Sequence, residues 1–85
     1  MKKDSILVKD ACAYRFKHLC HERGISYNEL ANESGVTPST VYSMLDTKRR
    51  DLSIITIKKL CDGLGITLSV FFDDPIFDSL EQEIR

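Results

Sequence analysis

The sequence is poor in the residues that usually organise small extracellular or metal-bound domains. It has no Trp, two Pro, four Gly and three Cys among 85 residues. The three cysteines, Cys12, Cys20 and Cys61, are odd in number and form no CxxC pair, which argues against a disulfide framework or a zinc site. We expect them to be small buried apolar residues in a reducing compartment, with redox sensing as a weaker possibility.

Long apolar runs are missing as well. The first apolar run is Ile6-Leu7-Val8, which is too short for the core of a signal peptide. No run approaches the roughly 20 apolar residues that a membrane-spanning helix needs. We therefore expect a cytoplasmic protein that does not enter a membrane.

Motifs of catalysis are also absent from the sequence. It contains no Ser-His-Asp order, paired-carboxylate constellation, P-loop or dinucleotide-binding glycine motif. A chain of this length forms one domain with a modest core and little room for a catalytic pocket. We expect a binding module, not an enzyme, that needs no cofactor.

The charges are unevenly distributed along the chain. The formal net charge is -1, but residues 73–85 carry five acidic side chains against Arg85, a net charge of -4. Residues 1–72 hold the other 11 basic and 8 acidic side chains, a net charge of +3. The acidic balance therefore belongs to the C-terminal tail, and the body of the chain is mildly basic.

Helical periodicity and capping signals predict five helices and an all-α fold. Helix one is expected from residue 8 or 10 to 23, helix two to about 34, helix three from 38 to about 46, helix four from 54, and helix five from 68 to 72. Residues 76–84 are expected to form a further amphipathic turn or two. The boundary signals are Gly24, the capping box Ser26-x-x-Glu29, Gly35, Thr37-Pro38, the caps Ser53 and Thr67, and Gly63 with Gly65 at the end of helix four.

The stretch GVTPSTVYSML, residues 35–45, has no charged residue and four Thr or Ser side chains around a proline. On a helical wheel Val41, Met44 and Leu45 share one side, whereas Ser39 and Ser43 lie nearly opposite. Two short helices separated by a glycine, the second with a displayed polar face, follow the pattern of a helix-turn-helix at residues 26–45. The alternative is a small helical bundle with a solvated Ser/Thr face.

A longer stretch of sequence favours the helix-turn-helix. The segment SYNELANESGVTPSTV at residues 26–41, followed by LGITLSVFF at residues 64–72, resembles the lambda-repressor-like, Cro/CI-type helix-turn-helix family over residues 10–72. The resemblance implies a compact five-helix DNA-binding domain with a short acidic C-terminal extension. It divides the chain into an N-terminal extension at 1–9, the domain at 10–72 and the acidic tail at 73–85.

The resemblance also implies which residues meet double-stranded DNA. The second helix of the motif is expected to read bases in the major groove through Thr37, Pro38, Ser39, Thr40, Tyr42 and Ser43. Phosphate contacts are expected from Ser26, Tyr27, Lys48, Arg49, Arg50 and, with less support, Lys17 and Arg15. We expect Arg23 to complement the C-terminal end of its own helix.

Two positions depart from the family pattern. Many relatives pair an Arg late in helix one with a Glu at the end of the reading helix, and these positions are Cys20 and Leu45 here. Because both have become apolar together, we predict that Cys20 packs on Leu45. The second departure is Asp46-Thr47, where Asn-Gly is common, which leaves the placement of the basic loop open.

The leading hypothesis for function is a transcriptional repressor that binds as a homodimer. The dimer surface is expected at helix five and the tail (Ile66, Phe71, Phe72, Ile76 and Phe77), unless these side chains pack within the monomer. One rival is an antitoxin whose acidic tail binds a protein partner. A second rival is a protein-interaction module that has lost DNA binding.

Overall fold

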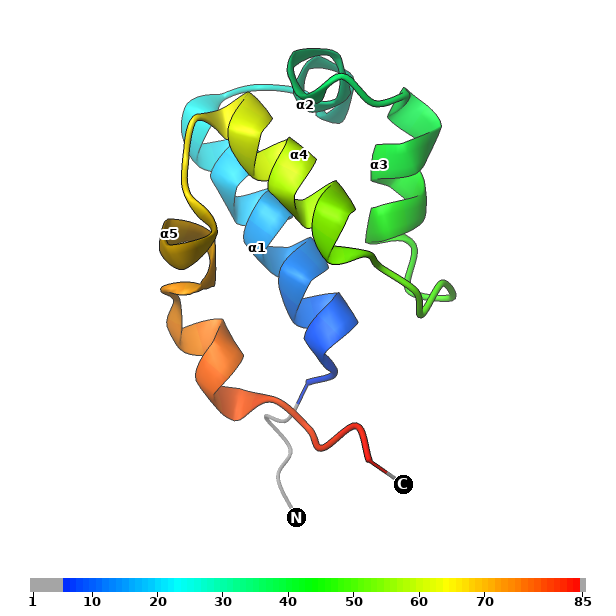
Figure 1. Cartoon of the computed structure of the whole chain (residues 1–85), viewed down its shortest axis with the longest axis vertical. Coiled ribbons are helices and arrows are strands. Elements are labelled where there is room, and N and C mark those ends of the chain that lie inside the picture. Colours follow the sequence, from blue (N-terminus) through cyan, green and yellow to red (C-terminus); the bar gives the residue numbers. More distant parts are fainter. Residues whose placement is uncertain (1–5, 85) are drawn as a thin grey trace.

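The structure, a computed structural model, describes residues 6–84 and consists mainly of helices (Figure 1). The predicted N-terminal extension therefore lies partly outside the described residues. The elements are α1 (Val8–Arg23), α2 (Tyr27–Ser34), α3 (Pro38–Leu45), α4 (Ile54–Leu64), α5 (Leu68–Phe72) and a short 3-10 helix, η1 (Pro75–Ser79).

The predicted capping residues begin these helices. Ser26 Oγ accepts a hydrogen bond from the Glu29 N–H at 3.1 Å, and Glu29 Oε1 accepts one from the Ser26 N–H at 2.8 Å, which completes the capping box. Thr37, Ser53 and Thr67 cap α3, α4 and α5 by one bond each, in which the side-chain oxygen accepts the backbone N–H three residues ahead. The five predicted helices are confirmed. Of the further turn or two predicted over residues 76–84, the structure forms only the 3-10 helix η1, because residues 80–84 are not helical.

One predicted boundary signal is wrong. Gly65 ends α4 in the left-handed conformation (φ +71°), but Gly63 lies inside the helix. An added Cβ at Gly63 would approach Ser34 Cα at 3.0 Å. Gly63 therefore allows α2 and α4 to pack closely, and it does not stop the helix.

The core fills the space between α1, α2, α3 and α4. Its largest fully buried side chains include Phe16 of α1, Leu30 of α2, Val41 of α3, Leu60 of α4 and Phe71 of α5, all 0% exposed. Each of the five helices thus contributes a buried side chain to the same cluster. Burial of this face leaves the opposite face of α3 to solvent.

Three cations of α1 bind carbonyl groups at the C-terminal ends of other helices. Lys9 Nζ donates to the Asp46 carbonyl after α3, at 2.6 Å. Arg15 donates to the carbonyls of Phe71 and Val70 in α5, at 2.7 and 2.9 Å. Arg23 donates to the Leu64 carbonyl at the end of α4.

These contacts add to two sequence predictions. Arg23 lies in the last turn of α1, as expected, and its side chain also donates to the end of α4. Arg15 donates to α5 and faces Asp74 at 3.5 Å, and its contact with phosphate stays a prediction. None of α3, α4 and α5 carries a basic residue in its own last turn, so α1 supplies the charge that each helix dipole favours.

The C-terminal segment folds back along α1 (Figure 1). The Phe77 ring packs 4.9 Å from that of Phe72 and 5.7 Å from that of Phe71, measured between ring centroids. Farther on, Leu80 forms a parallel bridge with Ile6. Glu83 accepts a hydrogen bond from the Val8 N–H at 3.3 Å, where α1 has no capping side chain of its own. The acidic tail therefore touches the helical body at Phe77, Leu80 and Glu83, while residues 78–84 are exposed.

Within residues 6–84, no helix is both long enough and apolar enough to cross a membrane.

Candidate nucleic-acid interface

The turn between α2 and α3 holds the two helices in a fixed relation. Gly35 ends α2 in the left-handed conformation (φ +69°), and the Val36 N–H reaches back to the Ala31 carbonyl at 3.1 Å. Val41 and Met44 bury one face of α3 at 0% and 2% exposure. The hydroxyl-bearing face of α3 is consequently displayed at the molecular surface.

Three hydroxyl groups cluster at the N-terminus of α3. Thr37 Oγ1 lies 3.0 Å from Ser39 Oγ and 3.1 Å from Thr40 Oγ1, and it accepts the Thr40 N–H at 3.3 Å. Pro38, at the first helical position, is exposed beside them. These contacts fix the orientation of the side chains before any partner arrives, which lowers the entropy cost of binding.

Tyr42 connects the outer face of α3 with the start of α2. Its side chain is 51% exposed, and its phenol donates to Asn28 Oδ1 at 3.3 Å. The ring meets that of Tyr27 edge to face, with centroids 5.9 Å apart. The sequence analysis missed Asn28. Its position next to Tyr27, in the first turn of α2, could have indicated that it lies near the interface.

The basic loop after α3 is well defined in spite of its unusual sequence. Asp46 Oδ1 accepts the Lys48 N–H at 2.9 Å, and the Asp46 carbonyl accepts the Arg49 N–H at 3.1 Å. The aspartate side chain therefore closes the turn for which relatives use Asn-Gly.

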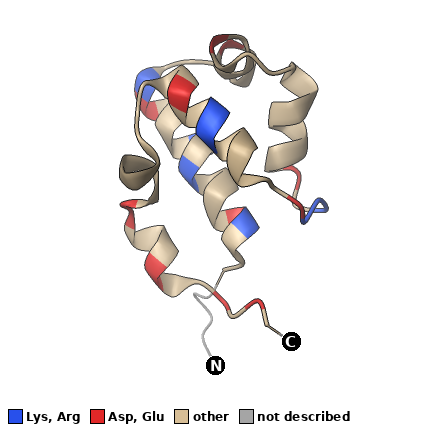
Figure 2. Ribbon diagram, in the orientation of Figure 1, with Lys and Arg blue, Asp and Glu red and all other residues tan. Residues whose placement is uncertain are grey.

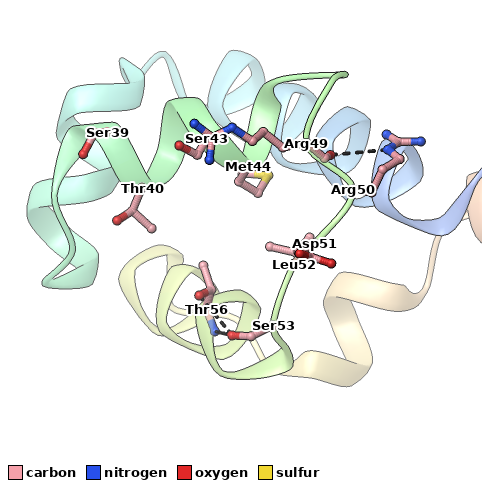
Figure 3. A pocket seen from close by; sticks show the side chains of 10 residues that line it. All are labelled: Ser39, Thr40, Ser43, Met44, Arg49, Arg50, Asp51, Leu52, Ser53 and Thr56. Carbon is pink, nitrogen blue, oxygen red and sulfur yellow. Dashed lines mark hydrogen bonds between the residues drawn. The ribbon is translucent and has the colours of Figure 1, made fainter.

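The two arginines of this loop point in different directions. Arg50 pairs with Asp10 of α1 through two contacts, at 2.6 and 3.5 Å. Figure 3 shows Arg49 extending toward Ser43 and Arg50 turning away toward α1. Of the two, Arg49 is the better placed for a ligand on α3.

A groove of about 320 Å³ lies between α3 and the start of α4 (Figure 3). It is lined by three sets of residues: Ser39, Thr40, Ser43 and Met44 from α3; Arg49, Arg50, Asp51 and Leu52 from the loop; and Ser53 and Thr56 from α4. Hydroxyls, a guanidinium group and a helix N-terminus therefore face one cavity, which is a suitable environment for a phosphate.

The sequence analysis missed the α4 side of this groove. Ser53 Oγ accepts the Thr56 N–H at 3.0 Å and lies 3.1 Å from Thr56 Oγ1. Ser53 was identified as a helix cap, and its position directly after the basic loop was the available signal. Asp51, also missed, brings a negative charge to the same groove.

The remaining predicted phosphate ligands lie elsewhere on the surface. Ser26 and Tyr27 flank the start of α2, where the Ser26 oxygen already accepts the capping hydrogen bond. Lys17 and Lys48 are exposed and do not line the groove. Figure 2 shows the basic loop beside the lower end of α3, away from the acidic residues of η1.

The cysteines lie in the core. Burial raises the pKa of the Cys12 and Cys61 thiols to about 11, and it raises the pKa of Cys20 as well. Cys20 is 2% exposed, and Leu45 packs against the same core cluster. Direct contact between Cys20 and Leu45 remains a prediction.

This arrangement defines a class of protein: a small helical domain that displays the second helix of a helix-turn-helix beside a basic loop. Comparison with known families agrees with the geometry, because the model of the Cro/C1-type HTH DNA-binding domain matches residues 15–73. The chain belongs to this family and is a DNA-binding transcriptional regulator.

Individual relatives agree with that assignment. The chain is 31% identical to prophage Lp1 protein 11, with a TM-score of 0.72 over 88% of this chain and 93% of that one. It is similar in fold to the restriction-modification controller protein C.Esp1396I (TM-score 0.74, 19% identity, 88% of this chain and 95% of the other). A variant of that controller, with the same TM-score and identity, has been solved bound to its highest-affinity operator site, OM.

A curated relative matches over a shorter segment. Control protein C.MunI, from a Mycoplasma species, is 43% identical over 35 residues, which are 41% of this chain and 47% of the relative. The match thus spans about half the length of that protein.

Proposed function

We propose that the chain is a sequence-specific transcriptional regulator, most simply a repressor, that places α3 in the major groove of double-stranded DNA. The observation that carries this proposal is the groove between α3 and the start of α4, where the hydroxyls of α3 face Arg49 and a helix N-terminus. An α-helix with its side chains is about 10–12 Å across, which fits the major groove of about 12 Å.

The reading chemistry follows from the displayed side chains. Ser and Thr hydroxyls both donate and accept, so Ser39 and Ser43 suit several base edges. Pro38 offers an apolar surface of the kind that contacts a thymine methyl group. Tyr42, fixed by Asn28, supplies one phenol in a defined place. Such a surface relies on shape as well as on hydrogen bonds.

The phosphate contacts follow from the charges around the groove. Arg49 reaches the groove without an ion-pair partner among the described residues, whereas Arg50 is paired with Asp10. The N-terminus of α4 adds a partial positive charge at Ser53. We therefore assign the main phosphate contact of the loop to Arg49.

Fluorescence anisotropy with duplex DNA at several salt concentrations tests the proposal. The native protein should bind with an affinity that falls as salt rises. The variant Arg49→Ala should weaken binding and flatten the salt slope by about one unit. Arg50→Ala should have a smaller effect, and Lys59→Ala, an exposed lysine of α4, serves as the control for net charge.

Absence of binding to random and selected duplexes, even at low salt, would overturn the proposal. It would instead favour the alternative in which this helix-turn-helix binds a protein. If the Arg49 and Lys59 variants bind DNA with equal salt slopes, the DNA-binding proposal holds. Arg49 would then not belong to the interface.

The proposed regulator acts as a homodimer, because single helix-turn-helix domains pair to read two half-sites. The apolar side chains expected at a dimer surface mostly pack inside the monomer: Phe71 is buried, and Phe72 and Phe77 pack against the core. Ile55, on the outer face of α4, is 62% exposed and is the better candidate.

Sedimentation tests this assignment. The variant Ile55→Asp should shift the protein toward monomer and weaken operator binding, whereas Asn32→Asp, which adds the same charge at an exposed position of α2, should do less. A native protein that is monomeric both in solution and on DNA would contradict the dimer.

Two further features belong to this proposal. A repressor acts where the chromosome lies, so we place it in the cytoplasm. An antitoxin-like tail is disfavoured as far as Phe77, whose ring packs against Phe72 within the chain, whereas Leu80 bridges Ile6 through the backbone and leaves its side chain 36% exposed. Among the apolar residues of the tail, Ile84, 79% exposed, is the most available for a protein partner.

A further inference from the structure

Lys9 is an unusual lysine because it is buried. Its residue exposure is 5%, and its ammonium group donates to the Asp46 carbonyl at 2.6 Å. Burial lowers the pKa of Lys9, and the nearby Arg50 lowers it further. The fold therefore keeps a cation in a place that disfavours charge.

Stability alone is a poor explanation for this lysine. A buried cation costs desolvation free energy, and the hydrogen bond that the structure gives the Lys9 ammonium is to a neutral carbonyl, not to a carboxylate. The contact does have a positional consequence, because Asp46 is the residue at which α3 ends and the basic loop begins. Its carbonyl also accepts the Arg49 N–H, so Lys9 holds the first turn of that loop.

The neighbouring residue of α1 holds the other end of the loop. Asp10 accepts hydrogen bonds from the Arg50 guanidinium at 2.6 and 3.5 Å. Consecutive residues in the first turn of α1 thus contact both ends of the segment 46–50. The segment between these contacts contains Arg49, whose side chain extends along α3 toward Ser43 (Figure 3).

We infer that Lys9 and Asp10 are positioning residues that set the basic loop against the reading helix, directing the Arg49 side chain toward Ser43 and pairing the Arg50 guanidinium with α1 at the edge of the groove. Neither residue needs to touch DNA for this role. The inference deepens the proposed function and rests on it for its effect on affinity. The loop geometry itself is measurable without DNA.

The first test compares Lys9→Met with Lys59→Met, which removes the same charge from an exposed site. Methionine retains most of the apolar stem of lysine and lacks the ammonium group. We expect Lys9→Met to lower DNA affinity roughly tenfold more than the control and to flatten the salt slope by about one unit. The melting temperature should remain equal to that of the native protein or rise.

A second readout uses the protein alone. Hydrogen exchange of the Lys48 and Arg49 amides, which are bonded to Asp46, should accelerate at least about fivefold in Lys9→Met and not in the control. If the native protein fails to bind DNA, the proposed function fails, and this exchange measurement still decides whether Lys9 orders the loop.

A variant of Asp10 should change the salt slope in the direction opposite to that of Lys9→Met. Asp10→Asn should release Arg50 for an additional phosphate contact, so the salt slope should steepen by about one unit. Glu22→Gln, an exposed acidic position on α1, is the matched control. Slopes equal to this control would remove Asp10 from the inference.

Two outcomes would overturn the inference while leaving DNA binding intact. One is that Lys9→Met matches Lys59→Met in affinity, salt slope and amide exchange. The other is a loss of affinity in Lys9→Met that only parallels a fall in melting temperature, because that would indicate a structural role without positioning.

Discussion

Ser34 and Gly63 mark the closest approach between α2 and α4. The Ser34 hydroxyl is buried, and it has no hydrogen-bond partner within the described part of the chain. The missing side chain at Gly63 provides the space for it. Single residues of this kind decide how tightly α2, the first helix of the motif, is held.

Gly63→Ala should therefore be destabilising, although alanine ordinarily favours a helix interior. The helix preference offers about 1 kcal/mol, but overpacking against Ser34 should cost about 1–3 kcal/mol. We expect a net loss in the free energy of unfolding, measured by urea denaturation.

Ser34→Ala provides the control for this contact. Removal of a buried hydroxyl without a partner should be neutral or stabilising by about 1 kcal/mol. If Gly63→Ala raised stability instead, the approach of the two helices would be looser than described.

The three thiols should be unreactive in the native state. Burial raises the pKa of Cys12 and Cys61 to about 11, so little thiolate forms at pH 8. A thiol-specific chromogenic reagent should label three groups in urea and very few in native buffer. Rapid labelling of a native thiol would revive the possibility of redox sensing.

The same shifts predict how stability depends on pH. A thiol that titrates near 9 when unfolded and near 11 when folded stabilises the fold below pH 9, and this contribution is lost as pH rises toward 11. The loss approaches about 2–3 kcal/mol for one such thiol, and the two losses are not additive because Cys61 contributes to the raised pKa of Cys12. Urea midpoints between pH 8 and 10.5 should fall less steeply in Cys61→Ala than in the native protein.

At the scale of helices, local sequence was sufficient to predict most boundaries. Ser26, Thr37, Ser53 and Thr67 each bond a backbone N–H three residues ahead, so their signals lie within one turn of the helix. Gly63 was misread because its role depends on Ser34, which is far away in the sequence. Capping is readable from sequence, and close packing between helices is not.

The candidate site was also predictable only where its residues depend on local sequence. Displayed residues such as Ser39 and Tyr42 follow from helical periodicity, and the family resemblance supplied their role. The pairing of Arg50 with Asp10 spans 40 residues and the Lys9–Asp46 contact spans 37, so neither leaves a periodic signal. Sequence therefore indicated the reading face but not what positions the basic loop.

The end of α5 provides a test at this scale. Arg15 donates to two carbonyls of that helix from one planar group, and lysine cannot reproduce this fork. Arg15→Lys should lower the free energy of unfolding by about 1–2 kcal/mol and accelerate amide exchange in α5.

Lys17→Arg is the matched control, since Lys17 is exposed two residues along the same helix. Its stability should stay within about 0.5 kcal/mol of the native value. Equal behaviour of the two variants would mean that α5 is held by apolar packing alone.

At the scale of the whole molecule, α1 is the element that organises the rest. Its cations Lys9, Arg15 and Arg23 contact the ends of α3, α5 and α4, and its N-terminus receives Glu83 from the C-terminal segment. The candidate interface lies on α3 and α4, yet its loop is held from α1. Changes on the side away from DNA should therefore affect binding.

The C-terminal segment offers the broadest test of this view. A chain ending at residue 73, where the family match ends, would lose the Phe77 ring and the Asp74–Arg15 ion pair. Burial of an aromatic ring of this kind contributes about 1.5–3 kcal/mol, so the shortened chain should unfold at distinctly lower urea. A chain ending at residue 81 keeps both contacts and the Ile6–Leu80 bridge, and it should stay within about 1 kcal/mol of the full chain. If the chain ending at 73 proved as stable as the full chain, residues 74–84 would contribute little to the fold and would be available to a protein partner, as in the antitoxin hypothesis.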